Sequence, residues 1–105
     1  MNETETVSSA SYRLKLIGVL ATAAGRREIQ IQGPSRLVLS GLISRLLAEV
    51  DKRQFTNLLI DSATNNPLPN VIILLNDQDC NLFQGLNTEL EPGTLVTIIP
   101  VAHGG

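Results

Sequence analysis

Apolar and polar residues alternate in two stretches near the start of the chain. The first, residues 12–20, opens with Tyr, Leu and Leu separated by Arg and Lys, and the second is residues 28–32. A period of two is the pattern of a half-buried strand. Small residues at 21–26 form a predicted turn ending near Gly25. We therefore predict a β-hairpin, which Gly-Pro-Ser at 33–35 ends.

A change of period after the hairpin predicts one main helix over residues 39–50. Its apolar residues recur at intervals of three and four, which places them on one helix face. They are Leu39, Leu42, Ile43, Leu46, Leu47 and Val50. Ser40 is the predicted N-cap, or Ser35 if the helix starts earlier. We expect the helix to end near Lys52 or Arg53, because basic side chains favour the C-terminal end of the helix dipole.

The segments after the helix carry weaker signals. Residues 55–60 fit either an irregular segment or a short strand, and the prolines and asparagines of residues 61–70 predict a loop. Residues 71–75 are apolar throughout, which is expected of a strand covered on both faces. A turn is predicted at residues 76–79. Residues 82–90 fit a short strand or a helical turn.

The last strand completes a pattern that favours one α+β architecture. Glu-Pro-Gly-Thr at 91–94 is a turn signal, and the apolar strand at 95–99 is ended by Pro100. We predict a β-grasp fold, in which one main helix packs across a mixed sheet of four to five strands. In this arrangement the first and last strands pair in parallel at the centre of the sheet.

Composition fits one small folded domain and excludes several classes of function. The chain has 105 residues, of which 43% are hydrophobic, and a formal net charge of -2. The charge argues against direct binding of nucleic acid, which requires a basic stripe. The single cysteine, Cys80, excludes an intramolecular disulfide, and one His with one Cys does not supply a usual zinc site. Without a signal peptide or a long apolar run, we expect no membrane association and a cytoplasmic location.

The two ends of the chain differ from its middle. Residues 1–11 are polar, and we expect a disordered N-terminal extension there. Residues 12–100 form the predicted β-grasp domain. Residues 101–105 are predicted to be a flexible tail that ends in Gly-Gly. If the chain is used as it stands, no residue after Gly105 has to be removed.

Five side chains invite a chemical interpretation, but each has a simpler one. Cys80 is expected to be a small, partly buried hydrophobe, and Asp79 beside it would raise rather than lower the pKa of the thiol. Asp77 and Asp79 are expected to be turn residues rather than a metal or catalytic pair. Lys15 and Lys52, the only lysines, are expected to be ordinary surface charges.

The second half of the chain resembles the ubiquitin-related modifier family of sulfur carriers. The matching segments are VIILLND at 71–77, the acidic turn on to Asp79, LNTELEPGTLVTIIP at 86–100 and AHGG at 102–105. The molybdopterin synthase small subunit and the thiamine-pathway sulfur carrier share the general pattern. Cys80 stands where the ubiquitin-related modifiers tend to carry an aromatic residue, and Pro-Val-Ala precedes the terminal HGG. The subfamily therefore stays open.

The resemblance implies that the working group is the carboxylate of Gly105. An E1-like enzyme would adenylate it with ATP and Mg²⁺, which that partner and not this chain would hold. Sulfur would then give a thiocarboxylate, for tRNA thiolation or cofactor biosynthesis. Gly104 and Gly105 lack Cβ and so allow close backbone approach in a narrow channel. His103 is either a spacer or a residue that the activating enzyme recognises.

Two other functions remain open at this point. The activated Gly105 could pass to a substrate lysine, which would make the chain a protein modifier. The chain could also be a plain β-grasp interaction module with an incidental Gly-Gly end, because one fold serves unrelated functions. An independent enzyme is disfavoured, since the sequence offers no nucleophile with a base, no metal set and no phosphate-binding loop.

Overall fold

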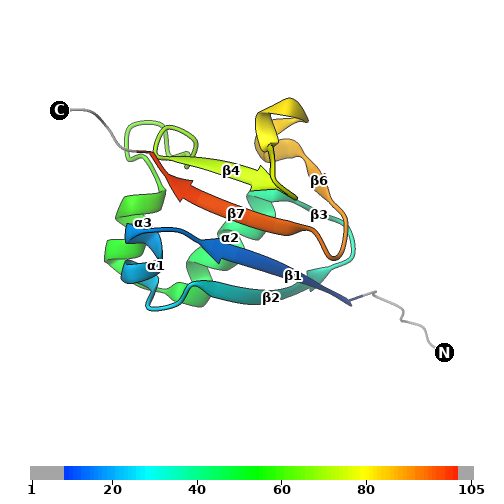
Figure 1. The fold of residues 1–105 in the computed structure, drawn as a ribbon, viewed down its shortest axis with the longest axis horizontal. Coiled ribbons are helices and arrows are strands. Elements are labelled where there is room, and N and C mark those ends of the chain that lie inside the picture. Colours follow the sequence, from blue (N-terminus) through cyan, green and yellow to red (C-terminus); the bar gives the residue numbers. More distant parts are fainter. Residues whose placement is uncertain (1–8, 102–105) are drawn as a thin grey trace.

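A parallel pair of strands lies at the centre of a five-stranded sheet (Figure 1). The computed structural model describes residues 9–101. The strand order is β2-β1-β7-β4-β5, with β1 and β7 parallel and the other pairs antiparallel. The strands are β1 (Ser9–Leu16), β2 (Glu28–Pro34), β4 (Val71–Leu75), β5 (Gln78–Asp79) and β7 (Leu95–Pro100). This topology confirms the predicted β-grasp fold and its central parallel pair.

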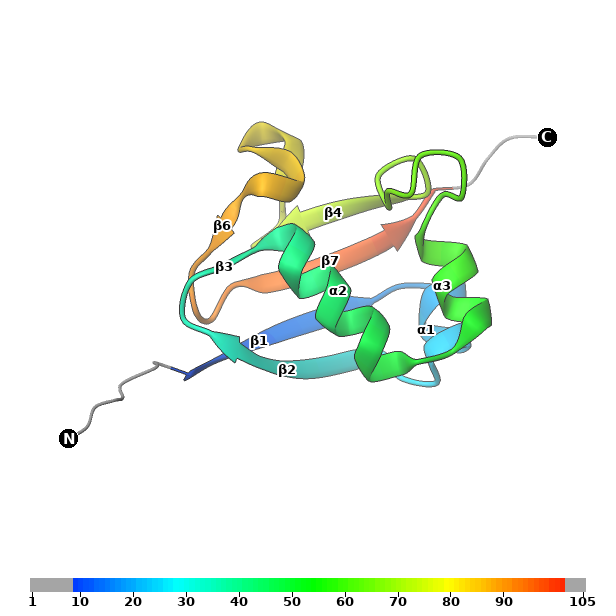
Figure 2. The same ribbon diagram turned by 180° about the vertical axis from the view of Figure 1, so that it is seen from behind.

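The other elements cover one face of the sheet or its ends (Figure 2). The helices are α1 (Val19–Ala24), α2 (Leu39–Val50) and α3 (Arg53–Leu59). Short β3 (Leu37–Val38) and β6 (Glu89–Leu90) form a second, two-stranded sheet. Two 3-10 turns, η1 (Cys80–Leu82) and η2 (Gly85–Asn87), connect β5 to β6. None of the helices within residues 9–101 has the length and apolar character that a membrane crossing needs.

Helix α2 packs its apolar stripe across the inner face of the sheet. The stripe residues buried there are Leu39, Leu42, Ile43, Leu46 and Val50. The helix body is as predicted, but its ends are not. Val38 is the N-cap and makes no side-chain capping bond, and Asp51 ends the helix in a left-handed conformation with no basic residue in the last turn. The predicted serine caps and basic C-terminus are therefore wrong.

Helix α1 occupies a segment that was predicted as the end of a strand and a turn. Strand β1 ends at Leu16, and Gly18 and Gly25 bracket the helix with φ values of 60° and 77°. Residues with a side chain rarely adopt these positive φ values, so glycine suits both ends of the helix. Leu20 and Ala24, which are one turn apart in α1, are the buried residues of this helix. The glycine pair was the available sequence signal.

Helix α3 corrects the prediction of an irregular segment or short strand at residues 55–60. Phe55 and Leu59 are fully buried and are spaced by four, so one turn of helix places both in the core. Residues 82–90 contain both predicted alternatives, the helical turn η2 and the short strand β6. At the start of the chain, β1 begins at Ser9, so residues 9–11 belong to the sheet and not to the predicted extension. Residues 1–8 lie outside the described residues.

The phenol of Tyr12 joins the first strand of the hairpin to the end of the second. Tyr12 is fully buried, and its hydroxyl donates a hydrogen bond of 2.6 Å to the carbonyl oxygen of Pro34. Burial raises the pKa of Tyr12 above its ordinary value, while the charge of nearby Arg45 acts in the opposite direction. The neutral phenol is thus the form that the folded chain favours.

We expect Tyr12→Phe to lower the free energy of unfolding at neutral pH by about 1 kcal/mol, because the Pro34 carbonyl loses its partner. The folded state binds the phenolic proton more tightly than the unfolded state, so wild-type stability should fall as pH rises above 10.0. The phenylalanine variant should lack this contribution to the alkaline slope. Urea unfolding monitored by circular dichroism between pH 7 and 11 measures both effects. Equal slopes in the two proteins would contradict the assignment.

Candidate functional site

The last described residues are held at one end of the sheet. The Val101 amide donates a hydrogen bond of 2.9 Å to the carbonyl oxygen of Asn70. The Asn70 side-chain amide in turn donates to the Leu58 carbonyl oxygen at 3.2 Å, which links this loop to α3. A Cβ built on Gly18 would meet Pro100 at 3.5 Å, so the start of α1 lies close beside the end of β7. The chain is therefore fixed through Val101, which is the first residue of the predicted tail.

The predicted site residues His103, Gly104 and Gly105 lie outside the described residues, and their roles stay predictions. Strand β7 ends at Pro100, the predicted end of the folded domain, and Val101 of the predicted tail is hydrogen-bonded to Asn70. Residues 102–105 would span at most about 14 Å if fully extended. A partner that reaches Gly105 must therefore come close to the end of the sheet.

The outer face of the sheet near this end is partly apolar. The outer-face patch comprises Ile72, Leu74 and Ile99; Ile72 is 41% exposed, and the other two are half-buried. The register pairs Ile72 with Ile99 and Leu74 with Thr97 across β4 and β7, and directly paired residues share a face. Helix α2 lies on the opposite face (Figure 2). The prediction that residues 71–75 are covered on both faces is therefore wrong.

Basic side chains border the outer-face patch on the β1 side. Arg13 and Lys15 are exposed, and the parallel register places Lys15 beside Thr97. Glu28, on the next strand, is paired with Lys15 and is also exposed. The face near the tail thus combines aliphatic surface with two cations and one carboxylate, a composition suited to a protein partner rather than to a small-molecule substrate.

Comparison with known proteins identifies the family. The model of the ThiS family matches residues 14–105. The chain belongs to the ThiS family. A protein described as ubiquitin-related modifier 1 homolog, from Drosophila simulans, is 29% identical over 80 residues, which make up 76% of this chain and 76% of that protein.

Several solved structures share the fold of this ThiS-family chain. SAMP1 from Haloferax volcanii is similar with a TM-score of 0.77 and 17% identity, and the match covers 90% of this chain and 99% of that one. Urm1 from Trypanosoma brucei gives a TM-score of 0.69 at 24% identity over 95% and 100% of the two chains. The ubiquitin-like fold and the family of sulfur carriers and protein modifiers are thereby confirmed. Members of this family are small carriers or modifiers rather than catalysts.

The outer-face patch of this ThiS-family chain was missed from the sequence. An unbroken apolar run does not reveal which of its residues face the core, so Ile72 and Leu74 were assigned to a buried strand. The pairing register with β7 supplies the missing information. The tail, in contrast, was predicted from the spacing between the last apolar strand and the Gly-Gly end, and it stays a prediction.

Of the two acidic residues predicted in a turn, Asp77 lies in one, whereas Asp79 belongs to strand β5 and caps the 3-10 turn η1. Asp77 is in a left-handed turn conformation with φ of 71°, and the Asp79 carboxylate accepts a hydrogen bond of 2.9 Å from the Asn81 amide at the start of η1. Within residues 9–101, no group of three potential metal ligands occurs. Of the two lysines, Lys15 is exposed, whereas Lys52 donates to the Ala24 carbonyl oxygen at 3.2 Å.

The thiol of Cys80 is fully buried at the start of η1. Burial raises the pKa of Cys80, and the adjacent Asp79 charge raises it further, the direction expected from the sequence. The thiolate, which is the reactive form, is therefore scarce at neutral pH. Cys80 acts as a core hydrophobe and is more completely buried than predicted.

We expect Cys80 in the native chain to resist alkylation by N-ethylmaleimide at pH 7.5 and to react within minutes in urea. Labelling would then report local or global opening rather than surface reactivity. The double variant Cys80→Ala, Leu82→Cys is the control, because Leu82 is 74% exposed two residues away. Mass spectrometry of timed aliquots measures both rates. Equal rates for the native chain and the control would contradict burial of the thiol.

Proposed function

We propose that this chain is a ubiquitin-like sulfur carrier whose Gly105 carboxylate is adenylated by an E1-like enzyme and then converted to a thiocarboxylate. The family match that extends through residue 105 carries the proposal. The fixed position of Val101 supports it, because the reactive end follows a rigid part of the fold at a short distance. Sulfur would pass on to tRNA thiolation or to cofactor biosynthesis. The activating partner would hold the ATP and Mg²⁺.

A free carboxylate needs activation because its oxygen is a poor leaving group. In the proposed first step a Gly105 oxygen attacks the α-phosphorus of ATP, and pyrophosphate leaves. A sulfur nucleophile then attacks the acyl carbon, and AMP departs with the carboxylate oxygen. Gly104 and Gly105 bring no Cβ into the channel where this occurs. This chain contributes presentation of the carboxylate, and the partner contributes the catalytic groups.

The outer-face patch is proposed to dock the activating enzyme. It lies on the strands that lead to the tail, and residues 102–105 span too little for the partner to act from a distance. Ile72 supplies exposed aliphatic surface, and Arg13 and Lys15 favour a partner surface with carboxylates beside apolar residues. His103 is proposed as a further recognition residue within the tail.

A second candidate is a protein modifier that joins Gly105 to substrate lysines. Its relatives favour this function, since one is a ubiquitin-related modifier 1 homolog and a structure of similar fold is that of small archaeal modifier protein 1. Both functions share the adenylation step and separate only when sulfur or an amine attacks. If self-conjugation occurs, Lys15 is the more available side-chain acceptor, because Lys52 is engaged with the Ala24 carbonyl.

We expect the full-length chain, incubated with ATP, Mg²⁺, sulfide and extract of its native host, to gain the mass of sulfur replacing oxygen. Peptide mapping should place the gain on Gly105, and deletion of Gly105 should abolish it. Cys80→Ala is the control, because it excludes a persulfide on the only cysteine. Conjugates on lysines without the mass gain would favour the modifier. If neither product forms, the plain interaction module is the function that remains.

We expect Ile72→Asp to slow ATP-dependent activation of Gly105 by about tenfold or more, because a carboxylate would be buried against the partner. The effect should appear in the concentration of carrier needed for half-maximal rate. Val38→Asp is the matched control, since Val38 is 40% exposed, lies away from the tail and occupies a helix N-cap where Asp is favoured. Equal rates for both variants would contradict docking through the outer-face patch.

A further inference from the structure

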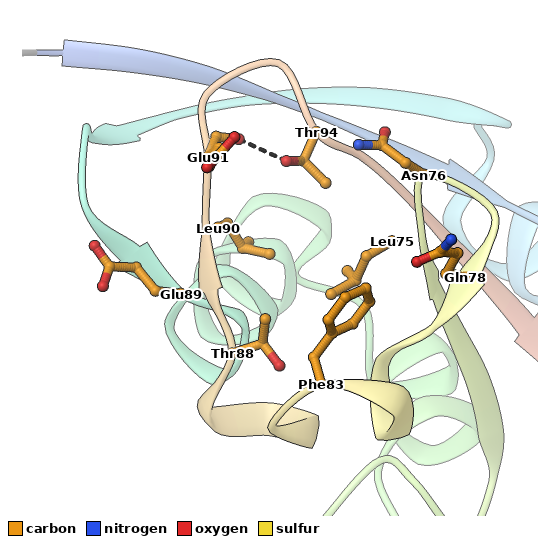
Figure 3. A pocket seen from close by; sticks show the side chains of 9 residues that line it. All are labelled: Leu75, Asn76, Gln78, Phe83, Thr88, Glu89, Leu90, Glu91 and Thr94. Atoms are coloured by element: carbon orange, nitrogen blue, oxygen red, sulfur yellow. Dashed lines mark hydrogen bonds between the residues drawn. The ribbon is translucent and has the colours of Figure 1, made fainter.

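A hollow lies beside the start of β7, at the end of the sheet away from Val101, and Figure 3 shows its lining. Its volume is about 360 Å³, within the range of sites that accept a small molecule or one large side chain. It is lined by Leu75, Asn76, Gln78, Phe83, Thr88, Glu89, Leu90, Glu91 and Thr94. These residues come from the end of β4, the turn to β5 and β5 itself, the segment from η1 to β6, and the turn before β7. The proposed carrier function uses none of them.

The walls of the hollow are held by specific hydrogen bonds. The backbone amide of Asn76 donates a hydrogen bond to the Leu95 carbonyl oxygen at 2.9 Å. The backbone amide of Leu95 donates to the side-chain oxygen of Asn76, also at 2.9 Å. The Thr94 hydroxyl donates to the Glu91 carbonyl oxygen at 2.7 Å (Figure 3). On the other side, the Gln84 amide donates to the Thr88 hydroxyl at 3.0 Å. Because both walls are pinned, the shape of the hollow is set before any partner arrives.

The floor is apolar and includes the most exposed aromatic ring in the described residues. The chain has three aromatic residues, and two of them, Tyr12 and Phe55, are fully buried. The third, Phe83, is 48% exposed, and its ring points toward Leu75 across the hollow (Figure 3). Leu90 also points into this space. An exposed aromatic residue beside aliphatic side chains in a pinned hollow is typical of a binding anchor.

The charges around the hollow are predominantly negative. Glu91 is on its rim, and within residues 9–101 no basic group lies within salt-bridge distance of this carboxylate. Glu89 points away from the hollow (Figure 3) and pairs with Arg36 at 2.8 Å. Asp77 and Asp79 lie on the neighbouring β4–β5 turn and strand β5. Such a site attracts a cation and repels nucleic-acid phosphates.

Position makes the hollow independent of the tail. Thr94 borders it immediately before β7, and Val101 follows the other end of the same strand. Thr94 and Val101 are seven positions apart in the sequence, which corresponds to about 23 Å of extended chain. A partner bound in the hollow therefore leaves the outer-face patch and the tail accessible.

We propose that this hollow is a second docking site, which receives an arginine or lysine side chain from an extended segment of a partner polypeptide. The aliphatic stem packs on Phe83, Leu75 and Leu90, and the cationic head lies at Glu91. Long basic side chains have this division between an apolar stem and a charged end. The site holds the chain without engaging its reactive end, and it does not depend on activation of Gly105.

The test uses the ¹⁵N-labelled full-length chain and capped pentapeptides Gly-Ala-X-Ala-Gly, in which X is arginine, norleucine or glutamate. The arginine peptide should shift amide resonances between residues 75 and 94, bind more tightly than the norleucine peptide, and weaken as salt rises. The glutamate peptide should cause no shift there. Deletion of Gly104 and Gly105 should leave binding unchanged, which separates this result from the carrier function.

Paired variants locate the contact. Phe83→Ala should weaken arginine-peptide binding by about fivefold or more, whereas Leu82→Ala, on the same 3-10 segment but outside the hollow, should not. Glu91→Gln should weaken binding, and Glu28→Gln, the same charge change on β2, should not. Equal effects within either pair, equal binding of arginine and norleucine peptides, or shifts only elsewhere would overturn the proposal. Self-association through the hollow, detected by sedimentation, would also overturn it.

Discussion

The parallel pairing of β1 and β7 is the constraint on which the rest of the structure depends. Antiparallel neighbours join through tight turns, but a parallel pair requires the chain to cross from one end of the sheet to the other. Here α2 makes the crossing over the inner face and closes the core with its apolar stripe. The final strand then lies at the centre of the sheet, with its end fixed between α1 and the loop at Asn70.

This arrangement divides the molecule by function. The inner face supplies stability, because it carries the continuous core between the sheet and α2. The outer face carries the proposed docking surface, because the outer-face patch lies there on β4 and β7. The two ends of β7 also differ, since one leads to the tail and the other borders an acidic hollow. One strand thus connects two surfaces that different partners can occupy at the same time.

An element could be predicted from the sequence when its local hydrophobic pattern was strong. The stripe on α2 was visible because six apolar residues repeat over three turns, whereas α3 presents only Phe55, Leu58 and Leu59 over seven residues. Helix α1 is short and rich in small residues, so its sequence resembles that of a turn. The tail, which stays a prediction, was proposed because its composition is unusual. The outer-face patch and the hollow were not, because both depend on pairing register and on segments that meet only in the folded chain.

The burial of Cys80 has a consequence for the selectivity of the chemistry. An activated acyl group reacts with any thiolate that reaches it, and a cysteine on the same chain would be present at a high effective concentration. Such an encounter would form an internal thioester, and the tail would become a closed loop. In this molecule the only sulfur nucleophile of the chain is enclosed by the core and held in its protonated form. The fold thereby keeps the proposed activated Gly105 from reacting with a thiol of its own chain.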